Sequence, residues 1–252
     1  MSRVLVATRL DFREQGRRPL LLVLLVGLPF FFITRSIALT SPLPREVVVA
    51  GGGHVLTTMR DIHGAVMAAI TVSFLAGLLG VFVIRSVRQA DRRLVVAGYR
   101  PVEVLVPRLL VLGAASTLVL TVSLAVTALS FQPKLWIAFV VGSLLTAISY
   151  AMLGALAGAV LGGLGATYLM LFASMLDLGI VQNPMFGTGA PPTWGALLPG
   201  YGPGQVIIDA AFSDHFHAWA ALGVGIGWAA ILVAAVVVVL ARVIRVDSHA
   251  SR

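Results

Sequence analysis

Asp177 is the one acidic residue placed well inside a long apolar run of this sequence. An ionisable side chain within a membrane span is costly and marks a functional site by default. Asp177 precedes Gln182 and Asn183 by five and six positions, which puts it roughly 8 Å from the end of its helix at about 1.5 Å per residue. Asp177, Gln182 and Asn183 are therefore candidates for a substrate pathway. The alternative interpretation is an acid that is wetted near the outer surface or paired with an outer arginine.

Two histidines, His215 and His217, flank Phe216, and such an alternating pair could ligate a metal. The further ligands nearby are only Asp209 and Asp214, so we interpret both histidines as interfacial residues and predict no metal site.

The sequence lacks the motifs that would give this chain chemistry of its own. Its only lysine, Lys134, stands in Gln-Pro-Lys-Leu, so a GxxxxGK(S/T) phosphate loop is impossible. There is no Cys, no HExxH and no GxSxG. We predict no catalytic residue and no cofactor bound by this chain, and energy for active transport would have to come from another protein.

The composition of the chain indicates the class of protein that positions these residues. The 252 residues are 59% hydrophobic and 11% charged, whereas a soluble domain carries roughly 25% charged residues. A soluble enzyme, a disordered chain and a disulfide scaffold are excluded. We predict an all-α polytopic membrane protein, with residues 1–252 forming one domain. About 20 apolar residues cross the hydrocarbon core, and six such helices are predicted, at about 19–40, 62–84, 107–130, 135–160, 164–182 and 217–242.

The distribution of Lys and Arg predicts the orientation of these spans. With both termini in the cytoplasm, fourteen of the eighteen basic residues lie inside and four lie outside: Arg35, Arg45, Arg60 and Lys134. The net charge of +8 is thus a topology signal, and we predict no nucleic-acid partner.

Segments between the spans carry further signals. Residues 1–18 predict a helix lying in the cytoplasmic interface, with a simple basic leader as the alternative. In the outer loop, Val47–Val49 resembles a strand and Gly51–Gly53 predicts a flexible turn. The outer segment 183–216 is broken by Pro and Gly, which predicts short re-entrant or interfacial helices before the last span.

The cytoplasmic loop 85–108 combines charge with an apolar patch, Leu94–Ala97. Gly98 suits a helix C-terminus, and Pro101 suits the first turn of a second short segment. This pattern predicts a helix whose apolar side is available to another protein. A solvated charged loop is the alternative.

Small residues recur at four-residue spacing in two of the predicted spans, which lets helix backbones approach closely in lipid. Packing within one subunit and dimerisation both remain open for these positions: Gly154, Gly158, Gly162, Gly223 and Gly227.

The layout resembles the membrane subunit of ATP-binding-cassette exporters of the type-2 permease family, which includes actinobacterial drug, lipid and polysaccharide exporters. The resemblance covers nearly the whole chain and rests on the N-terminal interfacial helix, the six spans and the loop after the second span. Asp91-Arg92-Arg93, Gly98, Glu103 and Pro107 match the family's loop motif loosely, with Tyr99-Arg100-Pro101 in place of a more usual Thr-Leu region. Leu-Leu-Pro at 197–199 and Gly-Pro at 202–203 are typical of its outer segment.

This resemblance implies a bacterial plasma-membrane permease that exports an amphipathic drug or lipid. Residues about 88–104 would form a coupling helix that docks in a groove of a separate ATPase subunit. The complex would contain two copies of this ATPase, which would bind the ATP and Mg. A second permease subunit, identical or related, would complete a pathway lined by the first, second and fifth spans. The implied coupling residues are Asp91, Arg92, Arg93, Gly98, Tyr99, Arg100 and Glu103. A polytopic membrane enzyme and a non-transporting membrane assembly factor are the alternatives.

Overall fold

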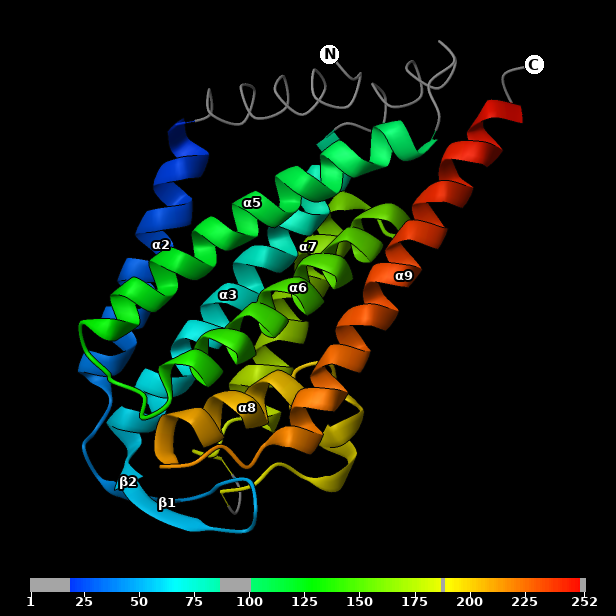
Figure 1. Cartoon of the computed structure of the whole chain (residues 1–252). Coiled ribbons are helices and arrows are strands. Elements are labelled where there is room, and N and C mark those ends of the chain that lie inside the picture. Colours follow the sequence, from blue (N-terminus) through cyan, green and yellow to red (C-terminus); the bar gives the residue numbers. More distant parts are fainter. Residues whose placement is uncertain (1–18, 87–100, 187–188, 250–252) are drawn as a thin grey trace.

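The computed structural model describes residues 19–86, 101–186 and 189–249 (Figure 1). The interfacial helix predicted at 1–18 lies outside these ranges, as do residues 87–100 of the predicted coupling loop. In the described part, the protein is a helical bundle with one β-hairpin at its end.

Five helices in the described ranges are long and apolar enough to cross a membrane. Their axes run side by side along the bundle (Figure 1). The predicted membrane character is thus confirmed at the level of length and composition. The five are α3 (Met59–Ser86), α5 (Pro101–Ala128), α6 (Trp136–Val160), α7 (Gly163–Leu176) with its π-helical extension η1 (Asp177–Val181), and α9 (Trp219–His249).

The first predicted span corresponds to α2 (Pro19–Leu39), a helix of 21 residues. At about 1.5 Å per residue this length reaches about 30 Å, the thickness of the hydrocarbon core. The apolar stretch found in its described part, Leu25–Leu39, is shorter than a full span. The layout of six spans therefore stays a prediction.

Helix α5 begins earlier than the sequence pattern indicated. We expected a short segment from Pro101 and a separate span from residue 107, but one continuous helix runs from Pro101 to Ala128 with Pro107 inside it. Pro101 fits the first helical position because its missing N–H is not needed there. An internal proline is tolerated in apolar helices because neighbouring groups can satisfy the freed backbone carbonyl.

The loop between α2 and α3 forms the hairpin, with β1 (Pro44–Val48) antiparallel to β2 (His54–Thr58) and Val47 opposite Val55. The turn uses Gly51 at φ 85° and Gly52 at φ 79°. These are left-handed conformations that glycine adopts without steric cost. The glycine run is thus a hairpin turn, and the strand-like Val47–Val49 run mostly lies in β1.

Helices α3 and α6 form the centre of the bundle and pack closely through glycine. A Cβ on Gly154 would overlap the backbone of Gly77, and a Cβ on Gly158 would lie 3.0 Å from the Val81 carbonyl oxygen. Gly154 and Gly158 therefore serve packing within this chain. At the other three glycines of the two predicted stripes, an added Cβ would have no atom of another described segment within 4 Å: Gly162, Gly223 and Gly227.

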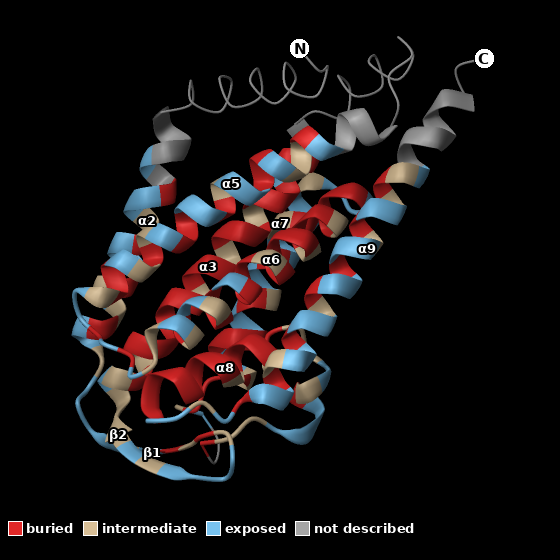
Figure 2. Cartoon of the chain, viewed as in Figure 1, coloured by how far each residue is buried: buried red, intermediate tan, exposed pale blue. Residues whose placement is uncertain are grey.

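The chain between α7 and α9 folds back against the hairpin end of the bundle, meaning the end that carries β1 and β2. It contains a 3₁₀ turn, η2 (Thr193–Leu197), and a short helix, α8 (Tyr201–Phe212). Helix α8 lies across the ends of the long helices and is buried at nearly every position (Figure 2). Segment 183–216 thus contains two short helical elements, η2 and α8, and their re-entrant or interfacial position in a membrane stays a prediction.

Candidate functional site

Asp177 lies where α7 changes into the π-helical turn η1, and it is 5% exposed. The Tyr150 hydroxyl, from α6, donates to Asp177 Oδ2 over 2.6 Å. The backbone N–H of Gly200, at the N-cap of α8, donates to the same oxygen over 2.8 Å. One carboxylate thus joins α6, η1 and the start of α8.

Gln182 extends this cluster to a fourth segment. Its Nε2 donates to Asp177 Oδ1 over 3.2 Å and to the Gly195 carbonyl of η2 over 3.0 Å. Asn183 stays local, because its Nδ2 donates to the Gly179 carbonyl and its Oδ1 accepts from the Met185 N–H. Asp177 and Gln182 are therefore hydrogen-bonded to each other, whereas Asn183 closes the turn that follows η1.

The carboxylate is enclosed on the side of α8 by backbone. A Cβ on Gly200 would lie 2.7 Å from the carboxylate carbon and both oxygens of Asp177. Glycine at this position lets the N-terminus of α8 approach the acid, where the free N–H groups and the helix dipole favour negative charge. Asp177 consequently acts as an internal cap for α8. The alternative interpretation of the sequence placed water or an outer arginine around Asp177, and the described contacts are instead Tyr150, Gln182 and Gly200.

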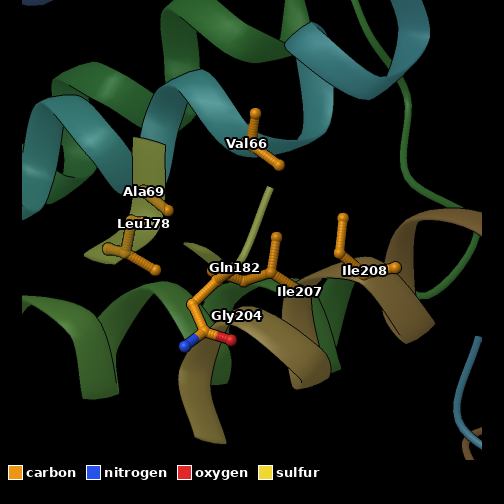
Figure 3. Close-up of a pocket in the computed structure, with 7 residues that line it drawn as sticks. All are labelled: Val66, Ala69, Leu178, Gln182, Gly204, Ile207 and Ile208. Carbon is orange, nitrogen blue, oxygen red and sulfur yellow. The ribbon is translucent and has the colours of Figure 1, made fainter. Parts of the chain in front are cut away.

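A small apolar cavity lies beside this cluster, between α3, η1 and α8 (Figure 3). Gln182 is the only polar side chain in its wall. The other lining residues are Val66, Ala69, Leu178, Gly204, Ile207 and Ile208.

A second buried acid, Asp209, orders the entry to α9. Its carboxylate accepts hydrogen bonds from the Ser213 hydroxyl at 2.9 Å, the His217 N–H at 2.7 Å and the Ala218 N–H at 3.1 Å. These amides come just before Trp219, where α9 begins. Asp209 thus caps α9. Among the described residues there is no group of three or more His, Cys, Asp or Glu side chains, including His215 and His217, that could hold a metal ion.

At the opposite end of the bundle, the predicted coupling residues Asp91, Arg92, Arg93, Gly98, Tyr99 and Arg100 lie outside the described residues. Glu103 falls in the first turn of α5. One contact near this loop is described: Arg85 Nη1 donates to the Leu161 carbonyl over 2.9 Å. A Cβ added at Gly163 would lie 3.2 Å from Arg85 Nε, so the guanidinium packs directly against this glycine. The end of α3 therefore contacts the turn between α6 and α7.

Sequence reasoning identified Asp177 and Gln182 but missed Tyr150, Gly200 and Asp209. Tyr150 carried a usable signal, because a tyrosine in the middle of an apolar helix needs a partner for its hydroxyl. Gly200 and Asp209 lay in a segment full of turns, where no periodicity indicated which polar group would be buried.

Comparisons with known protein families, with curated proteins and with solved structures find no match to this chain. The fold and the site define a helical bundle of the membrane-protein type, with long apolar helices and a buried carboxylate that anchors its folded-back segment.

Proposed function

We propose that this chain is the membrane-spanning permease subunit of an ATP-driven exporter, with α2 as the first of six spans and both termini in the cytoplasm of a bacterial cell. It would move an amphipathic drug or lipid outward, driven by a separate ATPase that docks at the loop between α3 and α5. A second permease subunit would complete the pathway.

The observation that carries this proposal is the form of the segment between α7 and α9. It enters the hairpin end of the bundle, turns at η2 and places α8 among the ends of α3, α6 and α9, with its residues from Val206 to Phe212 buried. A short buried helix that does not span suits an outer gate, because it can move without dismantling a span. The resemblance to type-2 permeases implies a gate at this place.

The Asp177 cluster gives this gate a closed state with defined contacts. Asp177 and Gln182 are nearly inaccessible while η2 and α8 lie against them. A substrate would reach these side chains only after α8 separates from η1 and α6, which breaks the hydrogen bond from the Gly200 N–H to Asp177. ATP-driven movement would have to favour the separated state, since a two-state gate shifts only by differential binding energy.

Motion at the ATPase would reach this gate through the long helices. Helix α3 leads into the predicted coupling loop, and Arg85 connects the C-terminal end of α3 to the turn that precedes α7. Helix α7 then ends at Leu176, directly before Asp177. A displacement of the loop would thus be transmitted along α3 and α7 to the closed gate.

The test is ATP-dependent transport in proteoliposomes that contain the full chain and its ATPase. Exchanging the charges of the predicted docking surface, with Arg93→Glu and Glu103→Arg together, should abolish substrate-stimulated ATPase activity while the chain stays folded. Arg60→Glu, at the hairpin end, is the matched control and should keep coupling. Unchanged stimulation in the double variant would contradict the proposed docking site.

The same preparation separates the proposal from its rivals. Hydrolytic activity of the isolated chain without the ATPase would indicate a membrane enzyme. Efflux that proceeds equally in vesicles lacking this chain would indicate a non-transporting assembly factor.

A further inference from the structure

Arg35 is a charged residue that the functions above leave unexplained. It lies inside α2, four positions before the helix ends at Leu39. The buried side of α2 is a stripe at four-residue spacing, consisting of Leu25, Pro29, Ile33 and Ile37. At 100° per residue, Arg35 lies about 200° around the helix from Ile33. It therefore stands on the face of α2 that is turned away from the rest of the bundle.

The side chains around Arg35 on this face are apolar and exposed. Phe31 and Leu39, one helical turn on either side, are 58% and 74% exposed. The exposed apolar surface continues along α2 toward its N-terminus through Val23, Val26 and Phe30. This inference rests on α2 being a membrane span, as the proposed function has it. The face turned away from the bundle then meets lipid, with a single positive charge near the hairpin end and apolar surface extending toward the bilayer centre.

Arg35 has no carboxylate partner among the residues that the structure describes. The five acidic side chains described all have other contacts. Glu46 lies 3.0 Å from His54, Asp61 accepts from Thr58, Asp214 lies 2.9 Å from Lys134, and Asp177 and Asp209 are buried in the clusters above.

Arg35 lies four residues of helix, or about 6 Å, below the end of α2. Its Cα–Cβ bond is tilted toward the helix N-terminus, which here means toward the bilayer centre. The long side chain has to bend back toward the nearer surface, as arginines near helix ends do, and this brings its guanidinium to the depth of the lipid headgroups. A charge at such a position is stabilised when polar groups are drawn down to it. Phosphate suits this role because its oxygens match the planar, five-donor fork of arginine.

We propose that Arg35 and the apolar face of α2 bind an anionic phospholipid in the leaflet at the hairpin end. The lipid phosphate would accept hydrogen bonds from the guanidinium, while its acyl chains would cover Phe31 and the exposed residues toward the N-terminus of α2. Charge at one end and apolar surface along the remainder match the two parts of such a lipid. A second copy of this chain would have to bring a carboxylate into the same apolar surface.

The experiment titrates purified, delipidated full-length chain in nonionic detergent with dioleoylphosphatidylglycerol and counts bound lipid by native mass spectrometry. Arg35→Leu should weaken binding of the tightest lipid about tenfold, since it removes charge-assisted hydrogen bonds. Arg35→Lys should fall between the two, because it keeps the charge but loses the fork. Arg60→Leu, also at the hairpin end, should bind like the wild type.

Three controls make the outcome decisive. Uncharged dioleoylglycerol should bind wild type and Arg35→Leu equally, and millimolar inorganic phosphate should not displace phosphatidylglycerol. Thermal unfolding without lipid should be the same for both chains, because Arg35 is exposed. Wild-type lipid affinity in Arg35→Leu would overturn the proposal, as would displacement by free phosphate. A loss of dimer mass in Arg35→Leu with lipid binding unchanged would also overturn it, and would assign the counter-ion to a second copy.

Discussion

At the scale of single residues, the buried carboxylate of Asp177 is stabilised by donors from three other segments. Tyr150 donates a hydroxyl, Gly200 a backbone N–H and Gln182 an amide. Removing one partner of such a cluster costs more than an average hydrogen bond, because the remaining polar groups stay buried. The cluster should therefore be sensitive to small chemical changes that leave its volume unaltered.

Tyr150→Phe removes one hydroxyl from a side chain that is fully buried. We expect it to lower the free energy of unfolding by about 1–3 kcal/mol, since the buried carboxyl group of Asp177 loses a hydrogen-bond partner. Thermal unfolding in detergent, followed by circular dichroism, would show this as a drop of several degrees in Tm. Tyr168→Phe on the exposed face of α7 is the matched control. Equal Tm values for the two variants would mean that the Tyr150–Asp177 contact does not stabilise the fold.

The exposed ion pair between Lys134 and Asp214 affects the pKa of Asp214. Hydrogen bonding to Lys134, and then its charge, lower the pKa of Asp214 below the ordinary value of 3.8. A lowered pKa means that the pair stabilises the fold above the ordinary pKa, and that this contribution is lost as the pH falls through the lowered value. Solvent and salt screen the pair, so its effect on stability is small.

Carbon NMR of chain labelled at Asp should show Asp214 titrating below 3.8 in low salt. Lys134→Met should move its midpoint upward, and added salt should do the same to a smaller extent. A midpoint that does not respond to Lys134→Met would contradict the assigned cause.

At the scale of elements, the close packing of α3 and α6 depends on glycines whose spacing is visible in the sequence. Their packing partner is not. The four-residue spacing of Gly154 and Gly158 was visible, but Gly77 and Val81, which they face, lie in another helix. A stripe of small residues shows that a backbone approaches, not which one. The same pattern in α9, at Gly223 and Gly227, has no atom of another described segment within 4 Å of an added Cβ.

Comparing Gly154→Ala with Gly227→Ala should distinguish a glycine that packs against another backbone from one that faces open space. The Cβ added by Gly154→Ala would overlap the Gly77 backbone, which is part of a packed helix and cannot rotate away as a side chain can. We expect α3 and α6 to be forced apart at a cost of about 1–3 kcal/mol. Gly227→Ala adds the same methyl group in open space and should leave Tm unchanged or slightly higher, because alanine favours helix. Chemical denaturation of both variants in the same detergent would measure the difference.

The accuracy of the sequence-based predictions varied with the kind of element. Helices α3, α6, α7 and α9 were predictable because long apolar runs have no other stable form in a membrane. The continuous α5 was not, because Pro101 and Pro107 resemble breaks when local rules are applied alone. The Asp177 cluster was half predictable: the cost of a charge singled out the acid, but only the fold brings Tyr150, 27 positions away, to its carboxylate.

At the scale of the whole molecule, the placement of the hairpin, η2 and α8 at one end gives the bundle two unlike ends (Figure 1). The other end carries the turn between α6 and α7 and the ends of α3 and α5 that border the proposed coupling loop. The proposed function requires the hairpin end to face outward. The excess of basic residues at the other end predicts the same orientation.

The absence of cysteine makes this orientation directly measurable, because each introduced thiol is the only one in the chain. Ser41→Cys and Ser130→Cys lie at exposed positions of the hairpin end, and Gly162→Cys lies in the exposed turn between α6 and α7. In intact cells, a membrane-impermeant maleimide should label the first two and reach the third only after permeabilisation. Helix α6 alone separates Ser130 from Gly162, so this labelling pattern requires α6 to span. Helices α3 and α5 separate Ser41 from Ser130, so labelling of both from outside requires α3 and α5 to cross as an antiparallel pair if either one spans. Labelling of Gly162→Cys alone in intact cells would reverse the orientation, moving the Asp177 cluster and α8 to the cytoplasmic side and ending their proposed role as an outer gate.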